Sequence, residues 1–304
     1  MTPLVKKGLL AVGVAIVLAL LGGGGVVYSK LASYDASMEK VYDLPLPAIT
    51  LSDDPAVLAR GEHLSKSLAS CAISECHGSD LAGGKSIVMG PLGTVTGPNI
   101  TKGGLGGVYT DAELVRLIRH GVKKDGRSVT FMPSFEFNWL PESDIVAIVS
   151  FIRSRPAVEK TNGPIEIGLL GKFVDRQGGI KLDIAGRIDH QNLPQGGPPQ
   201  PTAAYGKNVA LFCTGCHGDT FSGGAIPGAP PEIPIPTNIT SHPTGIQDWS
   251  EADFYKLLDT GIKKNGEKLD PFMPLEALTN MDAVERKALW EYLRSLPPLP
   301  FGGR

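Results

Sequence analysis

The sequence contains two copies of one pattern, and this repeat limits the possible folds more than any other feature. The tripeptide Asn-Ile-Thr occurs at residues 99–101 and again at 238–240, and Phe-Met-Pro occurs at 131–133 and again at 272–274. A Gly-x-Lys-Lys-x-Gly loop lies between these tripeptides in each copy. Repetition in this order predicts two domains that are built alike.

Helix signals stand at the same places in both copies. Thr110 with Glu113, and Ser250 with Asp253, have the spacing of a capping box, which satisfies free backbone N–H groups at a helix start. A helix that begins near Pro141 closes the first copy, and a matching apolar pattern closes the second. Helices joined by glycine-bearing loops predict an all-α fold.

A short cysteine motif lies in the second copy, where residues 213–217 read Cys-Thr-Gly-Cys-His. Two thiols at this spacing, followed directly by an imidazole, form the pattern that attaches haem c through its vinyl groups and ligates its iron. Cys213, Cys216 and His217 are therefore the predicted residues of one haem site. A Cys213–Cys216 disulfide, or half of a zinc site, stays open as an alternative.

The equivalent motif in the first copy is longer. Residues 71–77 read Cys-Ala-Ile-Ser-Glu-Cys-His, with four residues between the thiols where two are usual. Cys71 still reaches a second attachment point if the loop bulges outward, so Cys71, Cys76 and His77 are predicted to hold a second haem c. Attachment through Cys76 alone, or a Cys71–Cys76 disulfide, stays open as an alternative.

A second iron ligand is expected from one methionine in each copy. Met132 and Met273 lie 55 and 56 residues beyond the histidines at 77 and 217, and a proline follows each. A thioether ligand raises the reduction potential of a haem. Single methionines are often core filler, but the duplicate placement favours ligation. His63, Met89 and His120 are other potential ligands, and each is interpreted as a packing or surface residue.

The backbone near Pro98 is expected to orient one of the imidazoles. A carbonyl group there can accept the Nδ1 proton of His77 and so fix its tautomer. The segment that begins at Thr237 occupies the same place in the second copy, so the same role is expected of it toward His217.

The N-terminal residues include a long apolar stretch. No residue from 8 to 29 is charged, residues 9–21 are almost purely aliphatic, and Lys6 and Lys7 precede them. Such a stretch is long enough to cross a bilayer, and the two lysines hold its start in the cytoplasm. The sequence predicts a single transmembrane helix in residues 1–30, or a cleaved signal peptide, with everything after it outside the cytoplasmic membrane.

Composition supports two further expectations. The 304 residues carry a net charge of -2 and no concentrated Lys/Arg surface, so a nucleic-acid partner is not expected. Glycine (38) and proline (25) are abundant, which suits loops wrapped around a bound group. The predicted organisation is an anchor at 1–30, a linker at 31–54, a domain at 55–156, a linker at 157–201, a domain at 202–298 and a tail at 299–304.

Together these motifs resemble class I c-type cytochromes, in particular the tandem haem domains of cytochrome c subunits that partner periplasmic alcohol and sugar-acid dehydrogenases. The resemblance implies two tandem all-helical class I cytochrome c domains, each folded around one haem c and transferring single electrons. Those subunits usually carry three haems, whereas this sequence has two candidate sites. The residues that carry the resemblance are Arg60-Gly61, Cys76-His77-Gly78, residues 97–101, Met132-Pro133, Tyr205-Gly206, residues 213–218, residues 225–230, Trp249-Ser250 and residues 271–274.

The predicted function is electron transfer, without catalysis, by a membrane-anchored dihaem cytochrome at the periplasmic face of a bacterial inner membrane. A dehydrogenase, a quinol-oxidising complex or a terminal oxidase is the expected redox partner. One alternative is a dihaem enzyme, either a peroxidase or a sulfur-compound oxidoreductase, in which one haem has unusual ligands. The other is a haem subunit of a larger dehydrogenase or quinol-oxidising complex.

Overall fold

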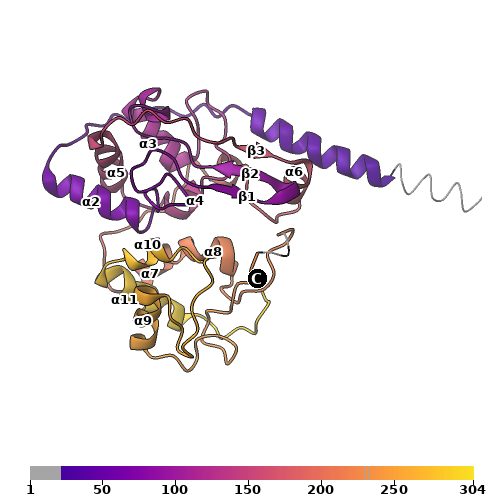
Figure 1. The fold of residues 1–304 in the computed structure, drawn as a ribbon, viewed down its shortest axis with the longest axis vertical. Helices are drawn as coiled ribbons and strands as arrows, with labels where there is room; N and C mark the ends of the chain where they lie inside the picture. Colours follow the sequence, from indigo (N-terminus) through magenta and orange to yellow (C-terminus); the bar gives the residue numbers. More distant parts are fainter. Residues whose placement is uncertain (1–21, 230, 232) are drawn as a thin grey trace, which may run out of the picture.

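The computed structural model describes residues 22–229, 231 and 233–304, and the two sequence copies form two packed lobes (Figure 1). The first copy (residues 55–156) lies above the second (202–298), and a helix at residues 22–39 projects to one side. The first copy contains α2 (Pro55–Lys66), β1 (Ser86–Val88), η1 (Gly90–Leu92), β2 (Gly93–Thr96), η2 (Leu105–Gly107), α3 (Asp111–His120), α4 (Ser134–Phe137) and α5 (Glu142–Ser154). The intervening segment contains β3 (Glu166–Ile167), α6 (Leu169–Asp175) and η3 (Ala185–Arg187). The second copy contains α7 (Ala203–Val209), α8 (Leu211–His217), α9 (Glu251–Thr260), α10 (Leu275–Thr279) and α11 (Ala283–Ser295).

The predicted capping boxes are confirmed at the starts of α3 and α9. Thr110 and Ser250 each accept a hydrogen bond from the backbone N–H three residues on, and the acidic side chain at that position accepts one in return. Both helices end at a glycine with left-handed backbone, Gly121 at φ 64° and Gly261 at φ 66°. Local sequence therefore fixes both ends of these helices.

The entry helix and the last helix of each copy pack closely at one glycine. A Cβ atom added to Gly61 of α2 would lie 2.0 Å from the carbonyl oxygen of Ala147 in α5. A Cβ atom added to Gly206 of α7 would lie 1.9 Å from the carbonyl oxygen of Ala288 in α11. Only glycine permits this approach, so both copies bring the same two helices together in the same way.

One hydrophobic core runs through both copies. The cluster of buried side chains that contains Leu64, Ile148 and Trp139 of the first copy continues into Tyr205 and Leu289 of the second. The Trp139 and Tyr205 rings meet edge to face with centroids 5.6 Å apart. The two copies therefore share apolar contacts across their junction, and these contacts fix their relative position.

The predicted all-α fold class is wrong, because the structure also contains a three-stranded antiparallel sheet in the order β1-β2-β3. In this sheet Ser86 pairs with Thr96, and Gly93 pairs with Ile167. The first two strands are rich in Ile, Val and Thr, which suit an extended backbone. The third strand comes from residues after 157, and local helix signals give no indication of such a distant pairing.

The segment predicted as a linker, residues 157–201, is folded against the first copy. Leu182 and Ile184 are fully buried. Asp183 pairs with Thr130 in an isolated β-bridge, and the backbone N–H of Phe131 donates to the Leu182 carbonyl at 3.3 Å. This segment therefore covers the loop that carries Met132. The predicted domain boundaries stay predictions.

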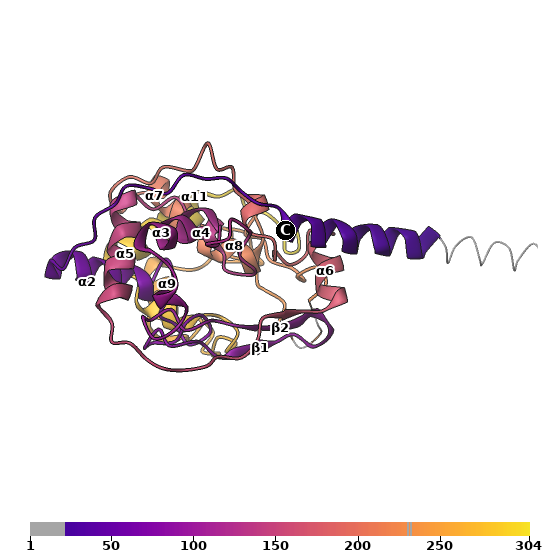
Figure 2. The same cartoon turned by 90° about the horizontal axis from the view of Figure 1, so that it is seen from above.

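The structure does not support the predicted transmembrane helix. No helix among the described residues is long and apolar enough to cross a membrane. Residues 1–21, which made up most of the predicted span, lie outside the described residues. Figure 2 shows the helix at 22–39 near α6. Lys172 of α6 pairs with Asp35 at 2.6 Å, and Tyr34 is buried.

Candidate functional site

The second cysteine motif forms the short helix α8. Cys213 and Cys216 are three residues apart on this helix, so both thiols lie on one face. Cys213 is buried, Cys216 is partly exposed, and both are free thiols. His217 is the last residue of α8, and Gly218 with φ 79° turns the chain away after it. The helix thus presents two thiols and an imidazole in the order that haem c attachment needs.

The imidazole of His217 is oriented by a backbone carbonyl. Its Nδ1–H donates to the carbonyl oxygen of Thr237 at 2.7 Å, which leaves Nε2 as the nitrogen available to a metal. Burial lowers the pKa of His217 below its ordinary value, so the ring is neutral at pH 7, as a metal ligand must be. The expected role of the Thr237 segment is confirmed.

The first cysteine motif forms a series of turns in place of a helix. The backbone N–H of Cys76 donates to the Ile73 carbonyl at 3.1 Å, and that of His77 donates to the Cys71 carbonyl at 3.0 Å. Both thiols are free. Burial raises the pKa of Cys76 to about 12, and the neighbouring Cys71 adds to this increase. The longer motif therefore still brings its two cysteines near each other and closes back on its histidine.

His77 has the same environment as its counterpart in the second copy. Its Nδ1–H donates to the carbonyl oxygen of Pro98 at 2.8 Å, as predicted. Burial lowers the pKa of His77 as well. The two motifs differ in spacing and backbone structure, but each ends in a neutral imidazole. In each ring the backbone carbonyl binds Nδ1, which leaves Nε2 available to a metal.

The two predicted methionine ligands pack against the same apolar core that contains Cys71 and Cys213. Met132 is partly buried in the loop before α4, and Ile184 and Ile188 of residues 157–201 belong to a cluster that also touches it. Met273 is partly buried in the loop before α10, and the Phe272 side chain beside it is 44% exposed. The Met132 loop is therefore covered by the chain itself, whereas the Met273 loop is open.

The open loop borders a cavity of about 410 Å³ between the two copies. Met273 and Phe272 line one side of it, and Ser74 and Glu75 of the first cysteine motif line the other. Ser74 donates two hydrogen bonds to Glu276 of α10, from its backbone N–H and its hydroxyl, both at 3.0 Å. The helix after Met273 thus contacts the cysteine motif of the other copy.

The opposite contact is made by the helix after Met132. This helix, α4, packs against α8 (Figures 1 and 2). A Cβ atom added to Gly215, between the two cysteines of α8, would lie 3.2 Å from Glu136 Oε1. Burial raises the pKa of Glu136 to about 8. The sequence analysis did not identify Glu136 or Glu276. Their similar positions, three residues after Pro133 and two residues after Pro274, are a signal that could have indicated them.

The other potential ligands lie elsewhere. Met89 is buried in a separate cluster with Leu92 and Val95. His120 contacts His190, with Nδ1 atoms 3.1 Å apart. His63 pairs with a carboxylate of the second copy. These contacts support the interpretation of all three as packing or surface residues.

Two pairs of free thiols, each followed by a neutral imidazole whose Nδ1–H is held by a carbonyl, fit haem c. Among the described residues, the cluster with three neighbouring metal-ligand side chains contains no cysteine, so neither motif completes a zinc site there. The donor atoms of both motifs are those that c-type cytochromes use to hold haem.

Comparison with known proteins agrees with this class. A family model described as cytochrome c matches residues 203–297. The chain is 25% identical over 285 residues to the cytochrome c subunit of alcohol dehydrogenase (quinone) from Gluconobacter oxydans, covering 82% of this chain and 56% of that protein. It is 27% identical over 274 residues to the fructose dehydrogenase cytochrome subunit of Gluconobacter japonicus, covering 79% and 52%.

A shorter match has a higher identity: 85 residues are 38% identical to the gluconate 2-dehydrogenase cytochrome c subunit of Pantoea cypripedii, covering 26% of this chain and 19% of that protein. The chain spans about half the length of the first two relatives. The predicted resemblance to cytochrome c subunits of dehydrogenases is confirmed. The names of these relatives agree with the expectation of an electron-transfer protein.

Proposed function

We propose that this chain is a dihaem cytochrome c that transfers electrons for a dehydrogenase outside the cytoplasm. The observation that carries the proposal is the pair of equivalent hydrogen bonds, His77 to Pro98 and His217 to Thr237, which orient an imidazole beside each thiol pair. Haem c, when bound, carries one electron by cycling its iron between two oxidation states.

The residues proposed to hold the two groups are of the same types, but different backbone structures carry the two pairs of cysteines. Cys213 and Cys216 would attach one haem from a regular helix, with His217 and Met273 as axial ligands. Cys71 and Cys76 would attach the other from a bulged loop, with His77 and Met132 as ligands. With both axial positions filled by protein atoms, each site favours electron transfer over activation of a small molecule.

Mass spectrometry of the denatured full-length protein tests this assignment. We expect a mass increase of two haems, because both motifs keep their thiols free and close to a histidine. Replacement of both Cys213 and Cys216 by alanine should leave one haem. An increase of a single haem in the unmodified protein would show that the longer motif does not attach one.

The cytochrome subunits named above support a dehydrogenase as the electron donor. The open loop around Phe272 offers a face on which a donor can come close to the second site. Attachment of haem c outside the cytoplasm would place the donor there as well. A quinol-oxidising complex or a terminal oxidase would then be the acceptor.

Reduction by a dehydrogenase can be measured directly. The tagged chain is purified at low salt from the cells that produce it, and the absorption bands of its haem are recorded while alcohols or sugars are added. We expect substrate-dependent reduction that is lost after a high-salt wash, because small transient interfaces are typical of redox partners. Reduction only by quinols would place the chain in a quinol-oxidising complex instead.

A further inference from the structure

A partly buried ion pair in the first copy has no exact counterpart in the second. Arg60 of α2 donates two hydrogen bonds to Asp144 of α5, at 3.1 and 2.7 Å. This pair lies beside the close contact of Gly61 with Ala147, and it joins the entry helix of the first copy to its last helix.

The same two positions in the second copy are occupied differently. Arg60 precedes Gly61, and Tyr205 precedes Gly206; Asp144 lies three residues before Ala147, and Glu285 three residues before Ala288. The second copy therefore keeps the carboxylate but has a phenol in place of the guanidinium. The Glu285 side chain has no exposed surface, and a buried carboxylate without a cationic partner is strongly unfavourable.

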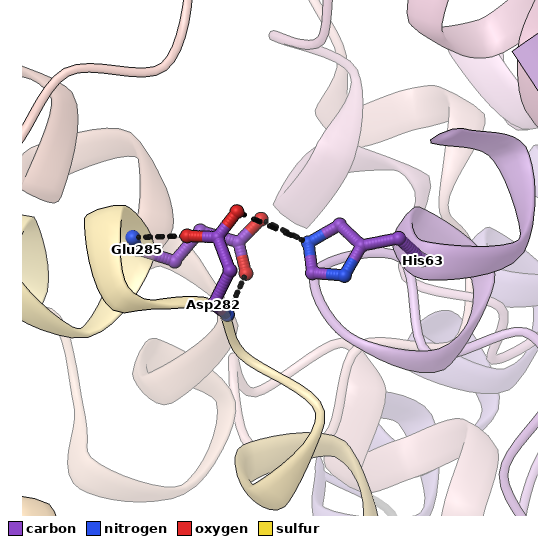
Figure 3. A group of neighbouring side chains, drawn as sticks. All are labelled: His63, Asp282 and Glu285. Atoms are coloured by element: carbon purple, nitrogen blue, oxygen red, sulfur yellow. Dashed lines mark hydrogen bonds and ion pairs between the residues drawn. The ribbon is translucent and has the colours of Figure 1, made fainter. Parts of the chain in front are cut away.

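The first copy supplies the missing partner. Figure 3 shows the ring of His63, from α2, pointing at Glu285 and Asp282 at the start of α11. His63 Nε2 lies 2.8 Å from Glu285 Oε1 and 3.7 Å from Asp282 Oδ2. The other oxygen of each carboxylate accepts a backbone N–H within the capping box of α11. Both carboxylates are thus fixed, with one oxygen each facing His63.

Charges on all the neighbouring helices act on this ring. Glu285 and Asp282 of α11 favour the imidazolium, and Arg60 of α2 opposes it. Asp144 of α5 is engaged by Arg60, and Tyr205 of α7 is uncharged at neutral pH.

We propose that His63 and Glu285 form a protonation-dependent ion pair that holds the two copies in their relative position. They act as positioning residues for electron transfer between the two sites, a consequence that rests on the proposed function. The ion pair itself does not depend on haem.

The pH range follows from the direction of the shift. The hydrogen bond to Glu285 outweighs burial and raises the pKa of His63 above its ordinary value of 6.5. The stabilisation is therefore complete below the pKa of the unfolded chain, and it is lost as the pH rises through the raised pKa of the folded protein. The junction should weaken on the alkaline side.

NMR titration of the histidine ring protons in the reduced full-length holoprotein, with EDTA present, measures this directly. We expect His63 to titrate above pH 6.5, and the replacement Glu285→Gln to lower its pKa, because the hydrogen bond to Glu285 is the largest contribution that raises it. A wild-type pKa at or below 6.5, or one that Glu285→Gln leaves unchanged, would overturn the proposal. So would a titration that changes when EDTA is omitted, since the three side chains would then form a metal site.

Thermal unfolding between pH 6 and 9 is the second measurement. It tests the ion pair of His63 with Glu285 even if the Glu285→Gln variant does not fold. The wild-type Tm should fall across this range, and His63→Asn should remove most of that fall. His63→Lys should retain the stability at high pH, because lysine stays charged there. His242→Asn, which changes an exposed histidine bonded only within its own loop, should behave like the wild type.

The positioning role has its own readout. The rate of electron exchange between the two haems should decline as the pH rises in the wild type and become independent of pH in His63→Asn. If mass spectrometry finds both haems and the wild-type rate does not change with pH, the positioning role is wrong. If only one haem is found, the proposed dihaem function fails, while the titration of His63 still tests the ion pair.

Discussion

If the chain holds two haems as proposed, replacement of Met273 by alanine should lower the reduction potential of one haem and leave that of the other unchanged. A thioether ligand favours ferrous iron, so its loss shifts the potential downward by a sizeable part of the ~0.8 V range that axial ligands span. Met273 lies in the more exposed of the two methionine loops, where residues 270–272 are exposed. Potentiometric titration followed by visible absorption measures both potentials in one sample.

Two other variants serve as references for Met273→Ala. Met132→Ala should lower the potential of the other haem alone. Met89→Leu should change neither, because Met89 is buried among Leu92, Val95 and Val174, in a cluster that contains no cysteine and no histidine. Equal shifts at both haems after Met273→Ala would contradict two separate sites.

Replacement of Gly206 by alanine lowers the free energy of unfolding by about 3 kcal/mol, at the upper end of the usual cost of overpacking. The added Cβ atom would lie 1.9 Å from the carbonyl oxygen of Ala288 and 2.4 Å from its carbon. Both are backbone atoms, so no side-chain rotation can relieve the overlap, and α7 must move away from α11. An unhindered helix interior would instead gain roughly 1 kcal/mol from this replacement. The sign of the change therefore tests the packing.

Chemical denaturation followed by circular dichroism measures this effect. Gly61→Ala should have the same consequence in the first copy, where the overlap with Ala147 is equivalent. Gly197→Ala is the matched control: no atom lies within 4 Å of its added Cβ, so a change within about 0.5 kcal/mol is expected. An increase in stability for Gly206→Ala would show that the two helices do not approach as described.

The two methionine loops show how one repeated sequence acquires two different surroundings. Both copies carry Phe-Met-Pro after the same glycine loop. In the first copy, Phe131 has a left-handed backbone with φ 71° and its N–H donates to the Leu182 carbonyl. In the second copy, residues 270–272 are exposed. If both methionines ligate iron as proposed, the second site is the one that a partner protein can approach along this loop.

The sequence by itself determined what depends on neighbours along the chain. The spacing of Cys213, Cys216 and His217 is set within a single helix, and the capping boxes at Thr110 and Ser250 join residues three positions apart. The carbonyls that hold the two imidazoles were also predictable, because they stand at equivalent places in the two copies. The ligand assignments of Met132 and Met273 stay predictions.

Only the tertiary structure decided the contacts between distant segments. The strand at Glu166–Ile167, the cover that Leu182 gives to the Met132 loop, and the pair of His63 with Glu285 each join residues far apart in sequence. Periodicity and capping carry no information about such pairs, because their energy comes from burial and charge pairing that exist only after the two copies have packed. The contacts of Lys30 with the Arg176 carbonyl and of Asp35 with Lys172 likewise join segments that are far apart in sequence.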